Sequence, residues 1–242
     1  MDARLNNYPQ GKEYYEAAER GDPDAMFNLG LFYKKFIKDY QESLYWYEKA
    51  YKMGASGAAH NLGILYKESL KDYKKAEEWY LKAIEQNDKD TPRALGLLYE
   101  EKFQDYPKAI KWYKKAYEIG DIGGANNLGY LYDVTLKNTK EGIKWYKKAA
   151  QGGHANAIKN LGNVYHEQGD KIRGSAYIFA MVNYGYSKKE VFDFLKNDWK
   201  IDETTLKKAY QLQKTLDIPK HYYDKELEEN PTSKTTNPRG QR

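Results

Sequence analysis

The residue types with the most potential for chemistry in this sequence are its four histidines, His60, His154, His166 and His221. Imidazoles bind metal ions or move protons when they stand beside each other, or beside carboxylates, at defined spacings. None of the four pairs with another at a metal-ligand spacing. The 242 residues contain no cysteine, which excludes thiolate metal sites, cysteine nucleophiles and disulfides. We therefore expect structural or solvated histidines, with no metal and no cofactor.

Signatures of phosphate binding and of acid–base catalysis are also missing. The glycine-rich stretch GDIGGANNLG at 120–129 has no strand before it and no Lys-Ser or Lys-Thr after it. Carboxylates are numerous, but they occupy positions that suit helix caps and exposed helix faces. No pair of them is placed for general acid–base work. These observations predict a protein that is not an enzyme.

Basic residues form a recurring but balanced pattern. The formal net charge of +5 is too small to indicate a nucleic-acid partner by itself. Lysine doublets occur at 34–35, 74–75, 114–115, 147–148 and 207–208. Glutamates three or four residues away balance them, as on a solvated helix face. Nucleic-acid binding through these faces is retained as a second alternative function, although most of the aromatic residues that it needs are expected in the core.

Nothing in the sequence marks a targeting or membrane-spanning segment. The first ten residues, MDARLNNYPQ, contain no apolar run, and no later stretch approaches 18 consecutive apolar residues. We expect no membrane span and a cytoplasmic location, or a periplasmic one if a signal peptide has been removed.

The elements that must position any site repeat every 33 residues. A Leu-Gly pair recurs in this register, with a tyrosine four residues after the leucine, and a Trp-Tyr pair recurs in a second register. The leucines are Leu29, Leu62, Leu95, Leu128 and Leu161, and the tryptophans are Trp46, Trp79, Trp112 and Trp145. Repetition at a fixed period indicates a structural unit stacked on copies of itself.

Spacings within one unit are helical. Ala25, Leu29 and Tyr33 stand on one face of a first helix, and Trp46 with Ala50 on one face of a second helix. We therefore expect the tryptophan and the tyrosine of the second helix to lie in the core. The mid-helix glycine costs roughly 1 kcal/mol against alanine in each unit, which predicts close approach of two helix backbones.

Residue types at the helix ends support the same unit. The second helix is expected to begin after an N-cap at Asp39, Asp72, Asp105 or Asn138, with capping boxes to Glu42 and Glu141. It is expected to stop at Gly54, Asn87, Gly120 or Gly153, because glycine and asparagine tolerate the left-handed conformation.

The pattern resembles the Sel1-like repeat, a relative of the tetratricopeptide repeat. It is carried by Ala58, Leu62, Gly63 and Tyr66, then by Lys75, Ala76, Trp79, Tyr80, Lys82 and Ala83. The resemblance implies an all-α, right-handed α-solenoid of five 33-residue helix–turn–helix repeats. The usual Gly-x-Gly-Val turn between the two helices is missing, which shortens each unit by three residues.

The resulting organisation is an N-terminal arm at 1–10, an N-terminal capping helix (a half-repeat) at 11–24, five repeats at 25–186, a C-terminal helical cap at 187–229 and a flexible tail at 230–242. Met181 replaces a lysine that stands in this register in the four preceding copies. An apolar residue there predicts that the C-terminal cap covers it. Ser187 with Glu190, and then Asp202, are the expected helix starts of that cap.

The first helices of such a solenoid line a concave groove, and residues that point into it do not build the core. By analogy with the tetratricopeptide groove we assign them two before, one before, two after and five after each repeat leucine, and call them the groove positions. They are Phe27, Asn28, Leu31, Lys34, His60, Asn61, Ile64, Lys67, Arg93, Leu97, Glu100, Asn126, Asn127, Tyr130, Asp133, Lys159, Asn160, Asn163 and His166. Their types change from apolar and basic to polar and acidic along the chain. The recurring asparagine either binds a ligand backbone or joins neighbouring helices.

This sequence therefore predicts a monomeric, non-enzymatic adaptor that binds a partner protein in its groove, as a peptide segment, a helix or a toxin domain. The resemblance also supplies an alternative, because bacterial Sel1-like proteins include cognate immunity proteins that neutralise secreted antibacterial toxins.

Overall fold

The computed structural model describes residues 2–224, and over that range the chain is all-helical with no strand. It divides into two compact units, Met1–Asp121 and Ile122–Arg242. The five residues beyond Asp224 that were assigned to the C-terminal cap, and the predicted tail at 230–242, lie outside the described residues.

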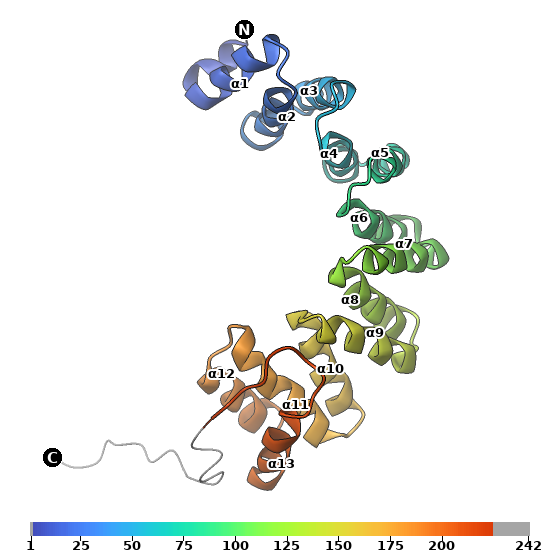
Figure 1. The fold of residues 1–242 in the computed structure, drawn as a ribbon, viewed down its shortest axis with the longest axis vertical. Helices are drawn as coiled ribbons and strands as arrows, with labels where there is room; N and C mark the ends of the chain where they lie inside the picture. The colour runs from blue at the N-terminus through green and yellow to red at the C-terminus, as the bar shows by residue number, and fades with distance from the viewer. Residues whose placement is uncertain (1, 225–242) are drawn as a thin grey trace, which may run out of the picture. The chain divides into compact units, whose positions relative to one another are not determined.

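Helices of the first unit form two layers. In Figure 1 the first helices α2, α4 and α6 lie along one side and the second helices α3, α5 and α7 along the other. Each first helix packs on the second helix that follows it. The bounds are α1 Pro9–Glu19, α2 Pro23–Phe32, α3 Tyr40–Lys52, α4 Ala58–Leu65, α5 Tyr73–Glu85, α6 Thr91–Leu98 and α7 Tyr106–Glu118, after a 3-10 turn at Ala3–Asn7.

The second unit continues the pairing and then closes it. Its first helices are α8 and α10, its second helices are α9 and α11, and α13 packs against α11. The bounds are α8 Ile122–Tyr130, α9 Thr139–Gln151, α10 Ala155–Glu167, α11 Lys171–Ala180, α12 Lys188–Asp193 and α13 Glu203–Gln213. Because α3, α5, α7 and α9 begin 33 residues apart, the sequence period is the period of the helix pairs.

The predicted N-cap residues cap their helices, but Asp39 and Glu42 do not form the expected capping box, because the N–H of Asp39 bonds to the carbonyl of Tyr33. Asp39 accepts hydrogen bonds from the backbone N–H groups of Gln41 and Glu42, and Asp72, Asp105 and Asn138 each accept one from the residue three further on. The residues expected to end the second helices all have left-handed φ angles, 81° at Gly54, 62° at Asn87, 96° at Gly120 and 83° at Gly153. Asn87 therefore keeps the geometry of the glycines that it replaces.

The turn within each unit was not predicted. The first helix widens into a π-helical turn, at Tyr33–Ile37, Tyr66–Leu70, Tyr99–Phe103 and Leu131–Thr135. A left-handed residue then follows, with φ of 60° at Lys38, 57° at Lys71, 53° at Gln104 and 54° at Lys137. The N-cap N–H then bonds back to the carbonyl six residues earlier, for example Asp72 N to Tyr66 O at 3.0 Å. This closure is one residue wider than a Schellman motif and stands in place of the missing Gly-x-Gly-Val turn.

At four of the mid-helix glycines the nearest neighbour is an aromatic ring. A Cβ on Gly30, Gly63, Gly96 or Gly129 would meet the ring of Tyr47, Tyr80, Tyr113 or Tyr146 at 2.3–2.8 Å. The expected approach of two helix backbones also occurs, because a Cβ on Gly174 would lie 2.9 Å from the carbonyl of Gly162. The helices also touch nearby, because Ser43 Oγ donates a 2.8 Å hydrogen bond to the carbonyl of Gly30.

The repeated tyrosines are buried as predicted, but the tryptophans are not uniformly so. Trp46 and Trp145 are buried, whereas Trp79 and Trp112 are half-buried. A lysine one turn later covers the outer face of the indole, with Lys82 Nζ 3.9 Å from the centroid of Trp79. The stem and charge of the lysine shield a ring that the core does not enclose.

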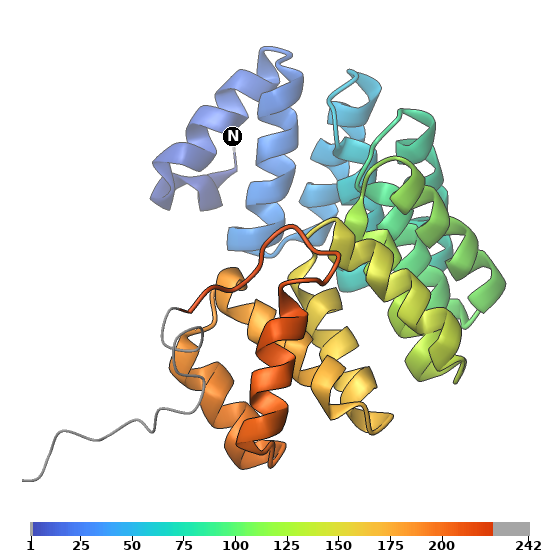
Figure 2. The same ribbon diagram turned by 60° about the horizontal axis from the view of Figure 1, so that its bottom comes forward.

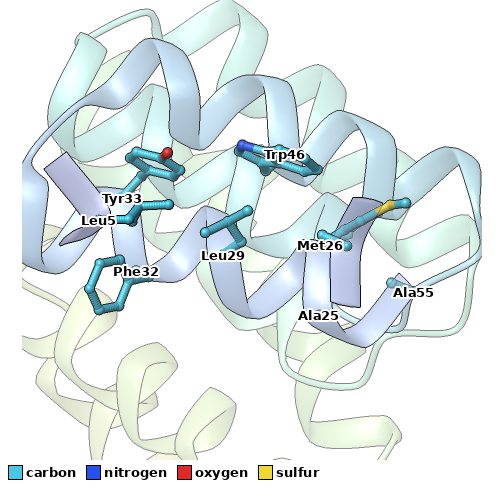
Figure 3. Packing of buried hydrophobic residues seen from close by; sticks show 11 residues of the cluster. Leu5, Ala25, Met26, Leu29, Phe32, Tyr33, Trp46 and Ala55 are labelled. Atoms are coloured by element: carbon cyan, nitrogen blue, oxygen red, sulfur yellow. The ribbon is translucent and has the colours of Figure 1, made fainter. Parts of the chain in front are cut away.

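The first ten residues take part in the core of the first unit. Leu5 is fully buried beside Phe32 and Tyr33, as Figure 3 shows. Arg4 binds the carboxylates of Asp2 at 2.7 Å and Asp39 at 2.8 Å, and Tyr33 donates a 3.0 Å hydrogen bond to Asp2. The segment assigned as an arm therefore fastens the first helix pair.

The apolar Met181 predicted that the C-terminal cap covers the last helix pair, and the second unit ends in this way. Met181 is buried, Ser187 and Glu190 form a full capping box, and Asp202 caps α13. Figure 2 shows the red segment after α13 turning back to end near α12. There Lys188 pairs with Asp224 at 2.7 Å, while Gln213 bonds both backbone groups of Tyr222.

Candidate protein-binding face

The groove positions share an intermediate environment. Tyr130 and Lys159 are exposed, and all the others are half-buried. The repeat leucines beside them are fully buried. The groove positions are therefore outside the core but are not freely solvated, as is typical of residues along a helix-lined face.

Tyrosines of the second helices reach this face in the first unit. The ring of Tyr47 lies 5.5 Å from Phe27, and the ring of Tyr80 lies 5.8 Å from His60. The hydroxyl of Tyr113 donates a 2.6 Å hydrogen bond to Glu100. These tyrosines start on the second helices, cross the mid-helix glycines and touch groove positions. Sequence reasoning assigned them to the core and missed this second role.

Basic groove positions of the first unit are paired to the next repeat. Lys34 lies 3.5 Å from Glu68, and Lys67 lies 3.1 Å from Glu101. In both cases the glutamate stands 34 residues later, one position beyond the equivalent of the lysine. Arg93 is bound to Asp121 at 2.6 Å. The predicted basic character of this part is therefore largely neutralised by neighbouring carboxylates, while Leu31, Ile64 and Leu97 keep it apolar.

His60 is held in a polar pocket of its own unit. Its Nδ1 lies 2.6 Å from Thr91 Oγ1, and Thr91 in turn donates to Asp88. Burial lowers the pKa of His60, against the opposing effect of the Asp88 carboxylate. This histidine is uncharged at neutral pH and joins two helix pairs, as expected of a structural residue.

Three of the four recurring asparagines have a hydrogen-bond partner within the protein, and one of them, Asn127, accepts a 3.5 Å bond from Asn126. Asn61 donates a 3.1 Å bond to the carbonyl of Gly57, and Asn160 donates a 3.4 Å bond to Asn126. The bond of Asn160 joins two first helices and favours the structural role there, whereas the bond of Asn61 stays within α4 and its N-cap.

Tyr130 stands out in the second unit. It is 49% exposed, whereas its equivalents Leu31, Ile64 and Leu97 are half-buried. One turn later Val134, 40% exposed, replaces the charged residue of the other repeats. Tyr130 and Val134 form an exposed apolar strip on α8 and the π turn that follows.

The C-terminal cap occupies part of the predicted groove. Trp199 stacks on His166 with ring centroids 3.9 Å apart and planes 8° apart, and Lys159 Nζ lies 6.0 Å from the ring of Tyr186. The groove face of α10 is therefore covered by the chain itself at His166, while Lys159 stays exposed. Prediction from register could not find this contact, because Trp199 lies outside the repeat.

Comparison with known proteins bears on this architecture. The Sel1 repeat model matches residues 56–88, 93–121 and 123–154, and a tetratricopeptide repeat model matches residues 2–59. A Sel1 repeat protein from Oxalobacter formigenes is 30% identical, with a TM-score of 0.51 over 64% of this chain and 66% of that one. The chain contains Sel1 repeats. It spans just under two thirds of that relative.

Two further solved structures are less similar in sequence to the present chain. MamA is 20% identical, with a TM-score of 0.50 over 65% of this chain and 98% of that one, which supports the solenoid fold alone. An immunity protein from Pseudomonas aeruginosa is 19% identical, with a TM-score of 0.43 over 91% of this chain and 78% of that one. No curated protein sequence matches significantly.

Sel1 and tetratricopeptide repeats are protein-interaction folds. Within residues 2–224 no group of three or more His, Asp or Glu residues is placed to hold a metal ion. In the same range no helix is both long enough and apolar enough to cross a lipid bilayer.

Proposed function

We propose that this Sel1 repeat protein is a non-enzymatic adaptor that binds a partner protein through the faces of its first helices. In the first unit the binding face comprises Leu31, Ile64 and Leu97, with Lys34 and Lys67 at its edge. In the second unit it comprises Tyr130 and Val134. The cap-covered face of α10 is excluded, apart from the accessible Lys159.

The observation that carries this proposal is that the core residues are the same in each repeat, whereas the groove positions differ between repeats. The repeated leucine, glycine and tyrosine pack the two helices of a pair against each other. The groove positions beside them vary in chemistry and stay partly accessible. A surface that the fold does not need for its own stability is free to be adapted to a partner.

Exposure at Tyr130 supports the same proposal. Large aromatic side chains contribute most of the binding energy in many interfaces, and a tyrosine offers apolar area with one hydrogen-bonding group. About half of the Tyr130 side chain is exposed beside Val134 and is not used in the packing of its own helix pair. The strip is therefore the surface of the second unit where a partner would gain most from contact.

The test is retention of a protein from a lysate of the native host by the full chain and by matched variants. Tyr130→Ala and Lys67→Glu alter the proposed face. Tyr45→Ala and Lys111→Glu are their controls on second helices, and Tyr45 is 50% exposed against 49% for Tyr130. We expect one protein to bind the parent and both controls, and to be lost or weakened tenfold or more by the face variants.

Other outcomes would redirect the assignment. Loss with the control variants alone would place the interface on the second helices. Equal retention by all five proteins would exclude the proposed face, and retention of no protein by the parent would contradict the adaptor function.

The two alternatives have less support. Lys34 is paired with Glu68 and Lys75 lies 3.7 Å from Asp72, so in each of these two doublets one lysine offers little free charge to nucleic acid. The immunity function rests on the family resemblance alone, because the TM-score of 0.43 to the Pseudomonas immunity protein is too low to support it. A secreted toxin as the retained protein would establish it.

A further inference from the structure

The second unit contains a hollow that its own side chains leave unfilled. It has a volume of about 260 Å³ and lies where α10, α11 and the C-terminal cap meet. Ile178, Met181, Val191 and Phe194 supply apolar walls, and the first three of them are buried. Small-molecule and cofactor sites usually measure about 300–1,000 Å³, so this hollow suits one large side chain better than a whole cofactor.

The hollow arises where the last helix pair departs from the repeated sequence. Met181 occupies the register of Lys49, Lys82, Lys115 and Lys148. A lysine here would place a charge against α12, whereas the thioether leaves an apolar wall. Methionine adapts its shape to varied contacts, and it is frequent on surfaces that bind apolar groups. The apolar wall is thus specific to this last helix pair.

The rim carries one lysine and one glutamate that do not form an ion pair with each other. Lys159, an exposed groove position, lines the hollow and has no carboxylate within ion-pair distance among residues 2–224. Glu190 also lines it, but Glu190 Oε2 accepts a 2.8 Å hydrogen bond from the backbone N–H of Ser187 in the capping box. The ammonium of Lys159 therefore remains available to a carboxylate from outside.

We infer that this hollow is an anchor pocket, which takes one phenylalanine- or leucine-sized side chain of the partner protein while Lys159 binds a carboxylate next to that side chain. The inference rests on the proposed function, because it assigns to the same partner a contact at the edge of the first-helix face. The ring of Tyr186, 41% exposed and at the rim, gives the entering side chain a further apolar contact.

The experiment uses a defined probe and the full chain. N-acetyl-L-phenylalanine carries an aromatic side chain beside a carboxylate, and N-acetyl-L-phenylalaninamide is its uncharged match. Each is titrated while the methyl signals of Met181 and Val191 are followed by NMR. We expect saturable shifts of both methyls with a millimolar dissociation constant for the acid, and binding about two- to fivefold weaker for the amide.

Variants separate the charge from the hollow. Lys159→Gln should weaken binding of the acid about two- to fivefold and leave binding of the amide unchanged. Lys196→Gln, an exposed lysine of the cap that does not line the hollow, should change neither. Absence of saturable shifts at Met181 and Val191 would overturn the anchor pocket. Equal binding of the acid and the amide would overturn the role of Lys159.

The outcome is independent of the lysate experiment. If the probe fails while a partner is retained through Tyr130 and Lys67, the pocket is wrong and the adaptor function stands. If the probe binds and a partner is found, Lys159→Glu should weaken that partner at least fivefold relative to Lys196→Glu.

Discussion

The hydroxyl of Tyr113 on α7 donates a 2.6 Å hydrogen bond to Glu100, which lies in the π turn after α6. The bond joins a buried residue of a second helix to a groove position of the preceding first helix. It fixes the carboxylate of Glu100 at the accessible face while its surroundings remove much of its solvent. The same tyrosine fills the space that Gly96 leaves open.

Stability should depend on pH through Glu100. Burial raises the pKa of Glu100, although the hydrogen bond from Tyr113 opposes the shift. A raised pKa means that the stabilisation is fully present below the pKa of the unfolded chain, and is lost as the pH rises through the pKa of the folded protein. Glu100→Gln should therefore increase the free energy of unfolding at pH 7 by roughly 0.5 kcal/mol and should reduce the loss between pH 4 and 7. Urea unfolding across that range measures it, with Glu101→Gln as the control.

Alanine at the mid-helix glycine should destabilise the protein despite its better helix propensity. The Cβ of Gly63→Ala would lie 2.4 Å from the ring of Tyr80. Overpacking costs about 1–3 kcal/mol and the propensity gain recovers about 1, so we expect a net loss of up to about 2 kcal/mol. In the background of Tyr80→Ala the same change should be neutral or stabilising. A stabilising Gly63→Ala in the native background would contradict the packing described above.

A glycine at the left-handed turn position should have the opposite effect. Lys71 has a φ of 57°. That conformation costs a non-glycine residue about 1–2 kcal/mol, from which the greater unfolded-state entropy of glycine subtracts roughly 0.4–1. Lys71→Gly should therefore raise the free energy of unfolding by about 0.5–1 kcal/mol. Glu78→Gly, at an exposed site inside α5, should lower it by about 1 kcal/mol. Destabilisation by both changes would mean that the strain at Lys71 is relieved by other contacts.

The first ten residues should contribute to the stability of the first helix pair. Leu5 is fully buried in the cluster of the first helix pair. Leu5→Ala should cost about 2–5 kcal/mol locally and speed hydrogen exchange in α1 and α2. Arg4→Ala removes only exposed ion pairs and should cost less than about 1 kcal/mol. Unchanged exchange in α1 after Leu5→Ala would show that this segment does not fasten the unit.

Much of the fold was predictable because its determinants are local and repeated. Asp39 and Asn138 mark helix starts, Gly54 and Asn87 mark helix ends, and both signals act within one turn of the residue itself. Met181 revealed a covered surface because its register could be compared with four lysines. The π turn was not predictable in this way, since it depends on how the helix pair closes and on no particular residue type at Lys38 or Gln104.

Of the candidate site, the sequence by itself determined which positions change while the frame stays constant. Only the tertiary structure decided how those positions are used. It paired Lys67 with Glu101 of the next repeat, brought the hydroxyl of Tyr113 to Glu100 and laid Trp199 over His166. The physical reason is distance along the chain. Periodicity fixes the direction of a side chain on its own helix, whereas the partner of that side chain comes from a neighbouring repeat or from the non-repeating cap.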